Sequence, residues 1–370
     1  MKHLLNITDY STEELQALID KAVFIISDPW AYNHSCEGRK LATLFFEPST
    51  RTRLSFEAAM LELGGRVISV TGSGGSSVTK GETLADTART VSCYADIIAV
   101  RHPLAGSARA MANSSAIPII NAGDGGHYHP TQTLADLLTV YREKGKLGGL
   151  RIGICGDLLY GRTVHSLIDA MSRYEGNSFV LISPKELMVP PYYTEKLQEL
   201  GIPFVQTDSL DEAIPEIDML YMTRIQRERF DDPAQYEKLA GRYILDANRM
   251  KGASRDCIVL HPLPRVDEIS TDFDDDPRAV YFTQAFNGKI MRKALILKLL
   301  AGKEHPDNTD MSPEGEKLFR EDTLSCTNSR CVCTHERGIR KEFYTDRHGT
   351  VRCAYCDQPV KDAGQAAPVL

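Results

Sequence analysis

The stretch "FFEPSTRTRLSFEAAMLELGG" places arginines where a helix is expected to begin. Ser49 or Thr50 is suited to cap that helix, and Arg51 and Arg53 fall in its first turn. The positive end of a helix dipole normally attracts carboxylates, so two cations there need an anionic partner. Free backbone N–H groups, hydroxyls and guanidinium forks together form a phosphate site. The predicted phosphate ligands are Ser49, Thr50, Arg51 and Thr52.

The tract "VTGSGGSSVTKGETLAD" is rich in Gly, Ser and Thr, and Lys80 is the cation within it. Such a segment does not pack a core. It is either a plain connector or a lid that brings Ser76 and Lys80 to an anionic ligand.

Further candidates follow expected strands or open expected helices. Arg101 comes directly after "DIIAV", at the strand end where open parallel sheets bind ligands. In "HYHPTQTLADLL", Pro130 fits the first helical position, so that His129 precedes the helix. We expect the helix field to lower the pKa of His129, which leaves a neutral imidazole able to donate to a carbonyl oxygen. Gln132 lies in the same first turn.

A second group of cations indicates a dicarboxylate. The glycines of "GICGDLLYGRTVHS" do not have the G-x-G-x-x-G spacing, which argues against dinucleotide binding. Arg162 instead opens a helix there, and Arg224 and Gln226 lie two apart on one side of an extended segment. Arginine forks bind carboxylates with two hydrogen bonds each, so the pair suits a ligand with two carboxylates.

The segment "VLHPLPRVDE" offers acceptors rather than donors. Pro262 and Pro264 lack N–H groups and hold their neighbours extended. The carbonyl of Leu263 is therefore available to a ligand rich in N–H groups, although a rigid turn without a ligand also fits the pattern.

Five of the nine cysteines fall near the C-terminus, and four of them form two pairs separated by 21 residues. That spacing is typical of a four-thiolate structural zinc site. The segment has few large apolar side chains, and zinc supplies about 10–16 kcal/mol of apparent folding free energy to such small units. Cys333 and His335 are alternative ligands. The predicted set is Cys326, Cys331, Cys353 and Cys356.

Short apolar runs alternate with amphipathic helical patterns over about 300 residues, which predicts parallel sheets covered on both faces. We expect an α/β fold of two doubly wound parallel-sheet domains followed by a small C-terminal zinc-binding β domain. The expected boundaries are 1–135 plus 285–303, 136–284, a linker at 304–320, and 321–370. The expected strands read "LATLFF", "RVISV", "DIIAV", "IPII", "RIGIC", "SFVLI", "DMLYM" and "CIVL".

The formal net charge of −7 argues against nucleic acid or an anionic membrane as a partner. No apolar run approaches the roughly 18 residues of a membrane span. The start "MKHLLNITDYSTEEL" has no signal-peptide core, so a reducing cytoplasm is expected.

Taken together, the chain resembles the aspartate carbamoyltransferase family over residues 1–303. The motifs appear in the family's order: "FEPSTRTRLSFE", "KGETLADT", "RHP", "NAGDG", "HPTQTLAD", "GDLLYGRTVHS", "YMTRIQRER" and "HPLPRVDEI". The resemblance implies a carbamoyl-phosphate-binding domain at 1–135 plus 285–303 and an aspartate-binding domain at 136–284. It also implies transfer of the carbamoyl group to the α-amine of L-aspartate, a step of pyrimidine synthesis.

The resemblance also assigns roles to residues. The implied carbamoyl phosphate ligands are Ser49, Thr50, Arg51, Thr52, Arg101, His129, Gln132, Pro262 and Leu263, with Ser76, or Ser77 as its rival, from a neighbouring subunit. The implied aspartate ligands are Arg162, Arg224 and Gln226, with Lys80 from the neighbouring subunit. The catalytic set among these is Arg51, Thr52, Lys80, Arg101 and His129. The Leu263–Pro264 bond is expected to be cis, and the shared loop implies a homotrimer.

In the implied mechanism, Thr52, Arg101 and His129 donate hydrogen bonds to the carbonyl oxygen as it gains negative charge. The leaving phosphate accepts the amine proton, and neither a catalytic metal nor an organic cofactor takes part. Glu47 is expected to pair with Arg162 and Arg229 and so to stabilise a closed form.

The C-terminal unit resembles the zinc domain of the regulatory chain of the same family, without the nucleotide-binding half. It is expected to join catalytic chains, and so to pair two trimers. Three alternatives remain: an ornithine-type carbamoyltransferase, a catalytically silent scaffold with a zinc interaction module, and a zinc-ribbon nucleic-acid binder. The ornithine enzymes differ in reading His-Cys-Leu-Pro where this chain has "HPLP".

Overall fold

The computed structural model describes residues 2–72, 81–225, 236, 237, 239, 241–302 and 317–362. The chain divides into two compact units. Unit 1 comprises Met1–Tyr10, Phe24–Pro130 and Arg292–Leu370, and unit 2 comprises Ser11–Val23 and Thr131–Met291. The divisions fall within helices α1 (Thr12–Ser27) and α10 (Tyr281–Ala301) and at the start of α5 (Pro130–Lys144).

Unit 1 is built on a four-stranded parallel sheet in the order β2-β1-β3-β4. The central strands are apolar on both faces because helices cover parallel sheets on both sides, whereas the edge strand β2 is half exposed. The strands are β1 (Lys40–Phe45), β2 (Arg66–Thr71), β3 (Ile97–His102) and β4 (Ile119–Asp124). The helices that follow the first three strands are α2 (Thr50–Glu62), α3 (Leu84–Ser92) and α4 (Ser107–Ala112).

Unit 2 has a five-stranded parallel sheet in the order β7-β6-β5-β8-β9. Its strands are β5 (Arg151–Cys155), β6 (Ser178–Ile182), β7 (Phe204–Thr207), β8 (Met219–Met222) and β9 (Ile258–Leu260). Its helices include α6 (Arg162–Met171), α7 (Pro191–Glu199) and α8 (Leu210–Ala213). Short 3₁₀ helices lie at Lys185–Leu187, Ile214–Glu216, Arg249–Gly252 and Thr271–Phe273 in unit 2, and at Ile7–Asp9 in unit 1.

The predicted α/β class with parallel sheets is confirmed. All eight expected strand segments overlap a strand, and β7 is an additional one. In the part of the chain that the structure describes, no helix has both the length and the apolar character that a membrane crossing requires.

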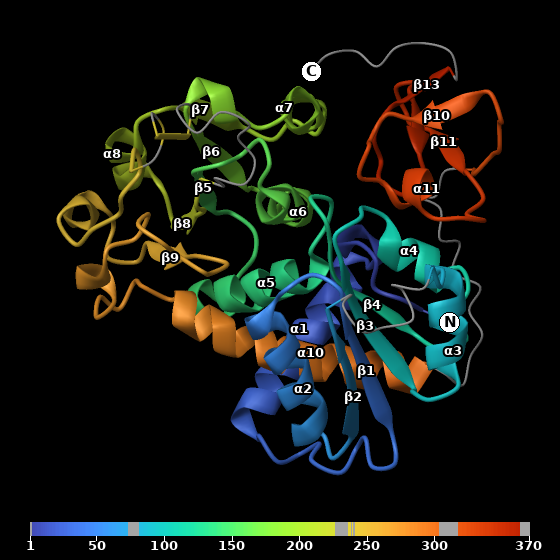
Figure 1. Cartoon of the computed structure of the whole chain (residues 1–370). Coiled ribbons are helices and arrows are strands. Elements are labelled where there is room, and N and C mark those ends of the chain that lie inside the picture. The colour runs from blue at the N-terminus through green and yellow to red at the C-terminus, as the bar shows by residue number, and fades with distance from the viewer. Residues whose placement is uncertain are drawn as a thin grey trace. The chain divides into compact units, whose positions relative to one another are not determined.

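The C-terminal segment of unit 1, residues 317–362, is a small antiparallel β structure, which Figure 1 colours orange-red. Strand β10 (Leu324–Cys326) pairs with β13 (Val360–Asp362), and β11 (Phe343–Thr345) pairs with β12 (Val351–Cys353). One short helix, α11 (Val332–His335), lies between β10 and β11.

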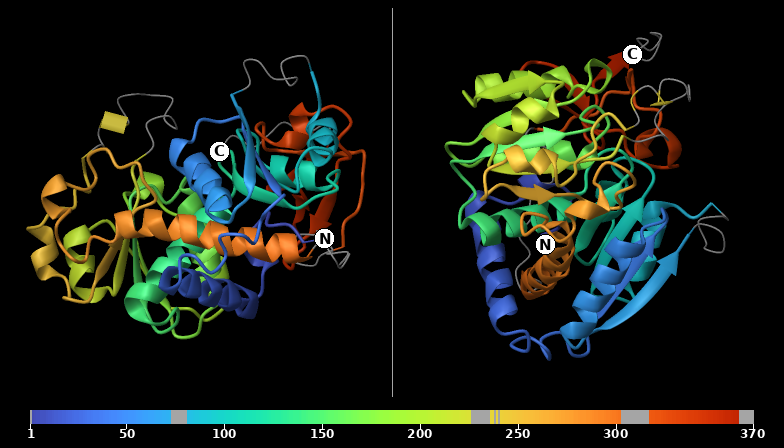
Figure 2. Two further views of the ribbon diagram at one scale, coloured as in Figure 1. Left: turned by 90° about the horizontal axis from the view of Figure 1, so that it is seen from below. Right: turned by 90° about the vertical axis from the view of Figure 1, so that its left-hand side faces the viewer.

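This segment packs against α4 and the loop before it, as Figure 1 and the left view of Figure 2 show. The N–H of Ala105 donates to the carbonyl of Arg330 (3.0 Å), and the N–H of Val332 donates to the carbonyl of Ala105 (2.9 Å). Cysteines and Tyr355 of the segment share one apolar core with the alanines of α4. The segment therefore continues the core of unit 1.

Gly106 tests this packing, because it has φ +79° and lies directly against Tyr355. A Cβ atom at Gly106 would approach the Cβ and the carbonyl oxygen of Tyr355 to 2.5 Å. Gly106→Ala is expected to lower the free energy of unfolding of unit 1 by the left-handed backbone penalty of about 1 kcal/mol plus about 1–3 kcal/mol of overpacking. Urea unfolding measures the loss.

Gly38 supplies the matched control, since it has φ +75° and no atom within 4 Å of the position that a Cβ would occupy. Gly38→Ala should show the backbone penalty alone. Equal losses in the two variants would contradict close packing at Gly106.

Candidate functional site

In unit 1 the candidate residues gather at the carboxyl ends of three adjacent strands. Glu47 and the start of α2 follow β1, Arg101 lies near the end of β3, and His129 follows β4. The strand register pairs Phe45 of β1 with Arg101 of β3, so these two strand ends are level. This is the edge at which open parallel sheets bind ligands.

The beginning of α2 has the form expected of an anion site. The helix starts at Thr50, Ser49 is its N-cap residue, and the Ser49 side chain makes no capping hydrogen bond. No acidic residue lies in the first turn. Arg53 is 3.8 Å from Glu57 one turn later, which gives this second arginine a partner within the helix. The N–H groups of the first turn are thus left for a ligand.

Two guanidinium groups lie at this edge, and the charge of Arg101 acts on Arg51. The pKa of Arg51 is lowered by burial and by the like charge of Arg101. Burial also lowers the pKa of Arg101, against the opposing effect of Glu47, whose carboxylate lies 2.8 Å away. The side chain of Arg101 is 11% exposed. A buried cation beside a second cation favours a multiply charged anion.

Unit 2 repeats this arrangement at the ends of β5, β8 and β9. Arg162 opens α6 after β5, Arg224 follows β8, and the turn containing Leu263 follows β9. The register pairs Cys155 of β5 with Met222 of β8, so Arg162 and Arg224 come from neighbouring strand ends. The geometry thus brings the two predicted carboxylate ligands to one sheet edge.

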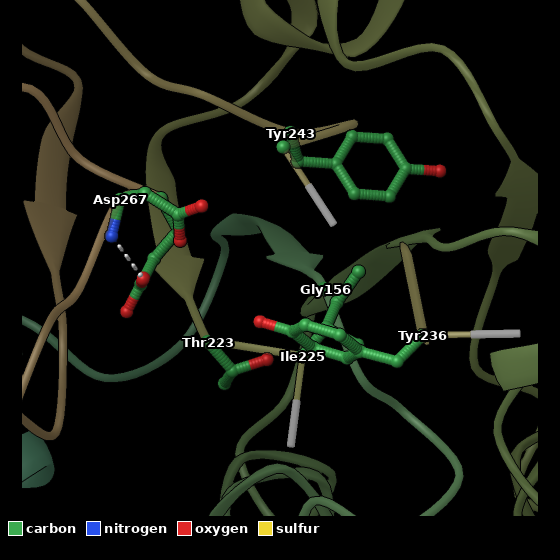
Figure 3. Close-up of a pocket in the computed structure, with 8 residues that line it drawn as sticks. Gly156, Thr223, Ile225, Tyr236, Tyr243 and Asp267 are labelled. Carbon is green, nitrogen blue, oxygen red and sulfur yellow. Dashed lines mark hydrogen bonds between the residues drawn. The ribbon is translucent and has the colours of Figure 1, made fainter. Parts of the chain in front are cut away.

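A small hollow lies at the same edge of unit 2, and Figure 3 shows the residues around it. Thr223 and Ile225, the neighbours of Arg224 in the chain, line it together with Gly156. Tyr236, Gly241, Tyr243, Asp267 and Glu268 complete the lining. Its cavity volume of about 20 Å³ is room for little more than one water molecule.

The turn after β9 is held by a buried histidine and a buried carboxylate. Nδ1 of His261 accepts the N–H of Leu263 (2.8 Å), so Nε2 carries the proton and donates to Glu268 (2.7 Å). The other carboxylate oxygen of Glu268 accepts the N–H groups of Val266 (3.0 Å) and Asp267 (3.1 Å). The dashed line in Figure 3 marks the contact with Asp267. The predicted cis peptide bond between Leu263 and Pro264 is confirmed, and Leu263 has φ 52°.

The cysteines of the C-terminal segment fit a metal. The ligand atoms of Cys326, Cys331, Cys353 and Cys356 all lie within 4.8 Å of one another, with Sγ separations of 3.4 Å for Cys326–Cys356 and 3.9 Å for Cys331–Cys353. In a tetrahedral site with Zn–S distances of about 2.3 Å, the four sulfur atoms lie roughly 3.8 Å from one another. All nine cysteines of the chain are free of disulfide bonds.

The two alternative ligands differ in position. Sγ of Cys333 is 3.3 Å from Cys331 and 3.7 Å from Cys353, but Cys333 is not part of the set in which all ligand atoms are mutually close. His335 is exposed, and its Nε2 contacts the carbonyl of Ser329. The geometry therefore favours the four cysteines predicted from spacing.

Sequence reasoning missed a buried charge cluster between the C-terminal segment and β4. His127 lies 3.0 Å from Asp124 and 2.9 Å from Asp357, the residue after Cys356. Burial opposes protonation, but the two carboxylates raise the pKa of His127 to about 10. Since His127 is two residues before His129, the cluster anchors the loop that carries a candidate ligand.

Several predicted residues lie outside the described residues: Ser76, Ser77, Lys80, Gln226 and Arg229. Glu47 pairs with Arg101, and its predicted pairing with Arg162 stays a prediction. The pKa of His129 likewise stays a prediction, while its side chain is buried.

Comparison with known proteins divides the chain into three matched parts. Residues 2–142 match the family "Aspartate/ornithine carbamoyltransferase, carbamoyl-P binding domain", and residues 148–299 match its "Asp/Orn binding domain". Residues 321–364 match "Aspartate carbamoyltransferase regulatory chain, metal binding domain".

Individual relatives agree with this division. The aspartate carbamoyltransferase catalytic subunit of Clostridium kluyveri is 56% identical over 299 residues, which are 81% of this chain and 98% of that protein. The solved catalytic subunit of M. jannaschii aspartate transcarbamoylase is 49% identical with a TM-score of 0.77, over 82% of this chain and 99% of that one. Aspartate transcarbamoylase from Trypanosoma cruzi, solved in complex with N-(phosphonacetyl)-L-aspartic acid, is 40% identical with a TM-score of 0.76, over 80% and 95% of the two chains.

The cysteine geometry predicts different outcomes for two neighbouring thiols. Cys331→Ser should lose most of the bound zinc, because it removes one of the mutually close sulfurs, whereas Cys333→Ser should keep about one zinc ion per chain. Metal analysis of the purified variants checks this. Comparable zinc loss in both variants would mean that Cys333 is a ligand.

Proposed function

Because the chain belongs to the aspartate/ornithine carbamoyltransferase family, we propose that it transfers the carbamoyl group of carbamoyl phosphate to L-aspartate. The products are N-carbamoyl-L-aspartate and phosphate, in a step of pyrimidine synthesis. The observation that carries this proposal is the pair of guanidinium groups of Arg51 and Arg101 beside the open start of α2.

The phosphate of carbamoyl phosphate would bind at that edge of unit 1. Ser49, Thr50, Arg51 and Thr52 supply hydroxyl, backbone and guanidinium donors, and Arg101 adds a second fork. A phosphate dianion there offsets the repulsion between the two arginines. Glu47 offsets part of the charge of Arg101 while the site holds no anion.

L-Aspartate would bind through Arg162 and Arg224, each of which suits one carboxylate. The α-amine then attacks the carbonyl carbon, and Thr52, Arg101 and His129 donate to the carbonyl oxygen as negative charge grows on it. Loss of one such donor typically lowers the rate by about 10²- to 10³-fold. The amine proton passes to the departing phosphate. Positioning of two anions beside each other supplies much of the remaining rate enhancement.

The choice of aspartate over ornithine follows from charge. Ornithine carries a second ammonium group, which two arginine side chains repel, whereas the second carboxylate of aspartate is attracted by them. The "HPLP" reading at 261–264 agrees with this choice.

We also propose a homotrimer in which Ser76 and Lys80 reach a neighbouring subunit's site, with C-terminal segments that pair two trimers. Zinc is held by Cys326, Cys331, Cys353 and Cys356. A reducing compartment such as the cytoplasm suits nine unpaired thiols.

The purified zinc-loaded chain is expected to form N-carbamoyl-aspartate and phosphate from carbamoyl phosphate and L-aspartate. With L-ornithine in place of aspartate, the rate should fall to background because of the charge repulsion at Arg162 and Arg224. Colorimetric detection of the carbamoylated amine checks both reactions. A chain that binds zinc but forms neither product would support the silent-scaffold alternative.

Arg224→Ala tests the aspartate site separately. Loss of a charged hydrogen-bond pair of about 1.5–3 kcal/mol should raise the KM for aspartate roughly 10- to 100-fold, with carbamoyl phosphate binding little changed. Arg242→Ala is the matched control, since Arg242 pairs with Asp208 on the exposed surface of the same unit. If both variants keep the KM of the parent chain, Arg224 is not a ligand.

A further inference from the structure

The buried carboxylate of Asp136 lies at the centre of a hydrogen-bond network in unit 2. Asp136 is 0% exposed. Its Oδ1 accepts the side-chain N–H groups of Gln132 (2.8 Å) and Gln284 (2.6 Å), and its Oδ2 accepts the hydroxyl of Tyr221 (3.1 Å). These partners come from α5, α10 and β8, so the carboxylate joins three elements.

The direction of these hydrogen bonds fixes the orientation of Gln132. An ionised carboxylate only accepts, so the amide of Gln132 must turn its NH₂ group towards Asp136. The Oε1 atom of Gln132 is then directed away from Asp136, and among the described residues it accepts no hydrogen bond. Gln132 therefore presents an acceptor, rather than a donor, to whatever binds beside the first turn of α5.

The same carboxylate reaches the turn after β9 through Gln284. The NH₂ group of Gln284 is held by Asp136, so its Oε1 is left to accept the backbone N–H of His261 (2.9 Å). His261 in turn accepts the N–H of Leu263, and the Leu263 carbonyl is the backbone polar group of this residue that is available to a ligand. Gln284 and His261 are 1% and 2% exposed.

We propose that Asp136 is a positioning residue that selects an NH₂ group on the donor substrate, by holding the Gln132 oxygen and the Leu263 carbonyl as a pair of acceptors. This inference rests on the proposed function, in which that NH₂ group belongs to carbamoyl phosphate. Acetyl phosphate carries a methyl group at the same place and donates no hydrogen bond. A site that presents buried acceptors disfavours such an analogue because the acceptors stay unpaired.

Variants of this network can be chosen that either keep or reverse the direction of its hydrogen bonds, and the proposal predicts different outcomes for the two kinds. Asp136→Ala removes the acceptor and allows the Gln132 amide to rotate. Asp136→Asn keeps Oδ1 as an acceptor if its new NH₂ group donates to the Tyr221 hydroxyl. Combining Asp136→Asn with Tyr221→Phe removes that hydroxyl, so the new NH₂ group loses this acceptor and is expected to turn towards a glutamine oxygen, which reverses one of the two amides.

The experiment measures dissociation constants of carbamoyl phosphate, acetyl phosphate and inorganic phosphate for the full zinc-loaded chain. Asp136→Ala and the Asp136→Asn/Tyr221→Phe double variant should each reduce the preference for carbamoyl over acetyl phosphate by about tenfold or more, the effect of one lost hydrogen bond. Inorganic phosphate should bind within about twofold of the parent chain. Tyr221→Phe and Asp136→Asn alone should keep most of the preference.

Two results would overturn the proposal. One is an unchanged preference in whichever of the two loss variants folds. The other is an equal loss of affinity for carbamoyl phosphate and inorganic phosphate, which would mean that Asp136 only supports the fold. If Asp136→Ala does not fold, the double variant, which keeps the volume of the side chains, gives the answer. A parent chain that binds inorganic phosphate but not carbamoyl phosphate would refute the proposed function itself.

Discussion

The like charges of Arg51 and Arg101 at one edge of the unit 1 sheet are the interaction on which the proposed phosphate site depends. The two guanidinium groups are close enough that the charge of Arg101 contributes to the lowered pKa of Arg51. Burial adds to the penalty at Arg101, and one carboxylate, Glu47, offsets part of it. Such an arrangement is unfavourable for folding alone, and a fold retains it where an anion of high charge density binds. The level ends of β1 and β3 are what hold the two arginines together.

The C-terminal segment is too small to fold on a hydrophobic core of its own, and it is stabilised by packing against the rest of unit 1. Its cysteines and Tyr355 pack into the alanine-rich face of α4, and main-chain hydrogen bonds to Ala105 fix the register. The small side chains of the stretch "LAGSARAMANSSA" allow this close packing, because larger ones would hold the backbone of the C-terminal segment away from α4. The ion pairs of His127 with Asp124 and Asp357 add a polar contact at the same boundary, on the loop that leads to His129.

The sequence predicted the elements that carry strong local signals. The eight expected strands are runs rich in apolar and β-branched residues, whereas β7 was missed because "FVQT" is short and half polar. The arginines at the strand ends could be predicted because each one directly follows an apolar run or opens a helix, and both signals are local in the sequence.

The residues that sequence reasoning missed act on partners far away in the chain. Gln284 is 148 positions from Asp136, and Asp357 is 230 positions from His127, so no local pattern pairs them. One signal was present at Asp136, an acid four residues after Gln132 that lies among Leu134, Leu137 and Leu138 in the sequence. A buried carboxylate requires hydrogen-bond donors, so an acid at this position is expected to fix the orientation of the side chains that donate to it.

Charge and hydrogen-bond direction have separate tasks in this architecture. Arginines and a helix start attract any phosphate, because Coulomb forces respond to charge and hardly to what else the phosphate carries. Recognition of the transferable group must therefore come from neutral groups with a fixed donor or acceptor sense. The Leu263 carbonyl can only accept, and Gln132 has a fixed acceptor sense because Asp136 holds its NH₂ group. Gln284 and His261 fix the position of the Leu263 turn. Asp136, Gln284 and His261 are almost fully buried, so water cannot replace a lost hydrogen-bond partner unless a cavity forms. The Gln132 oxygen therefore remains an acceptor whether or not a substrate is bound.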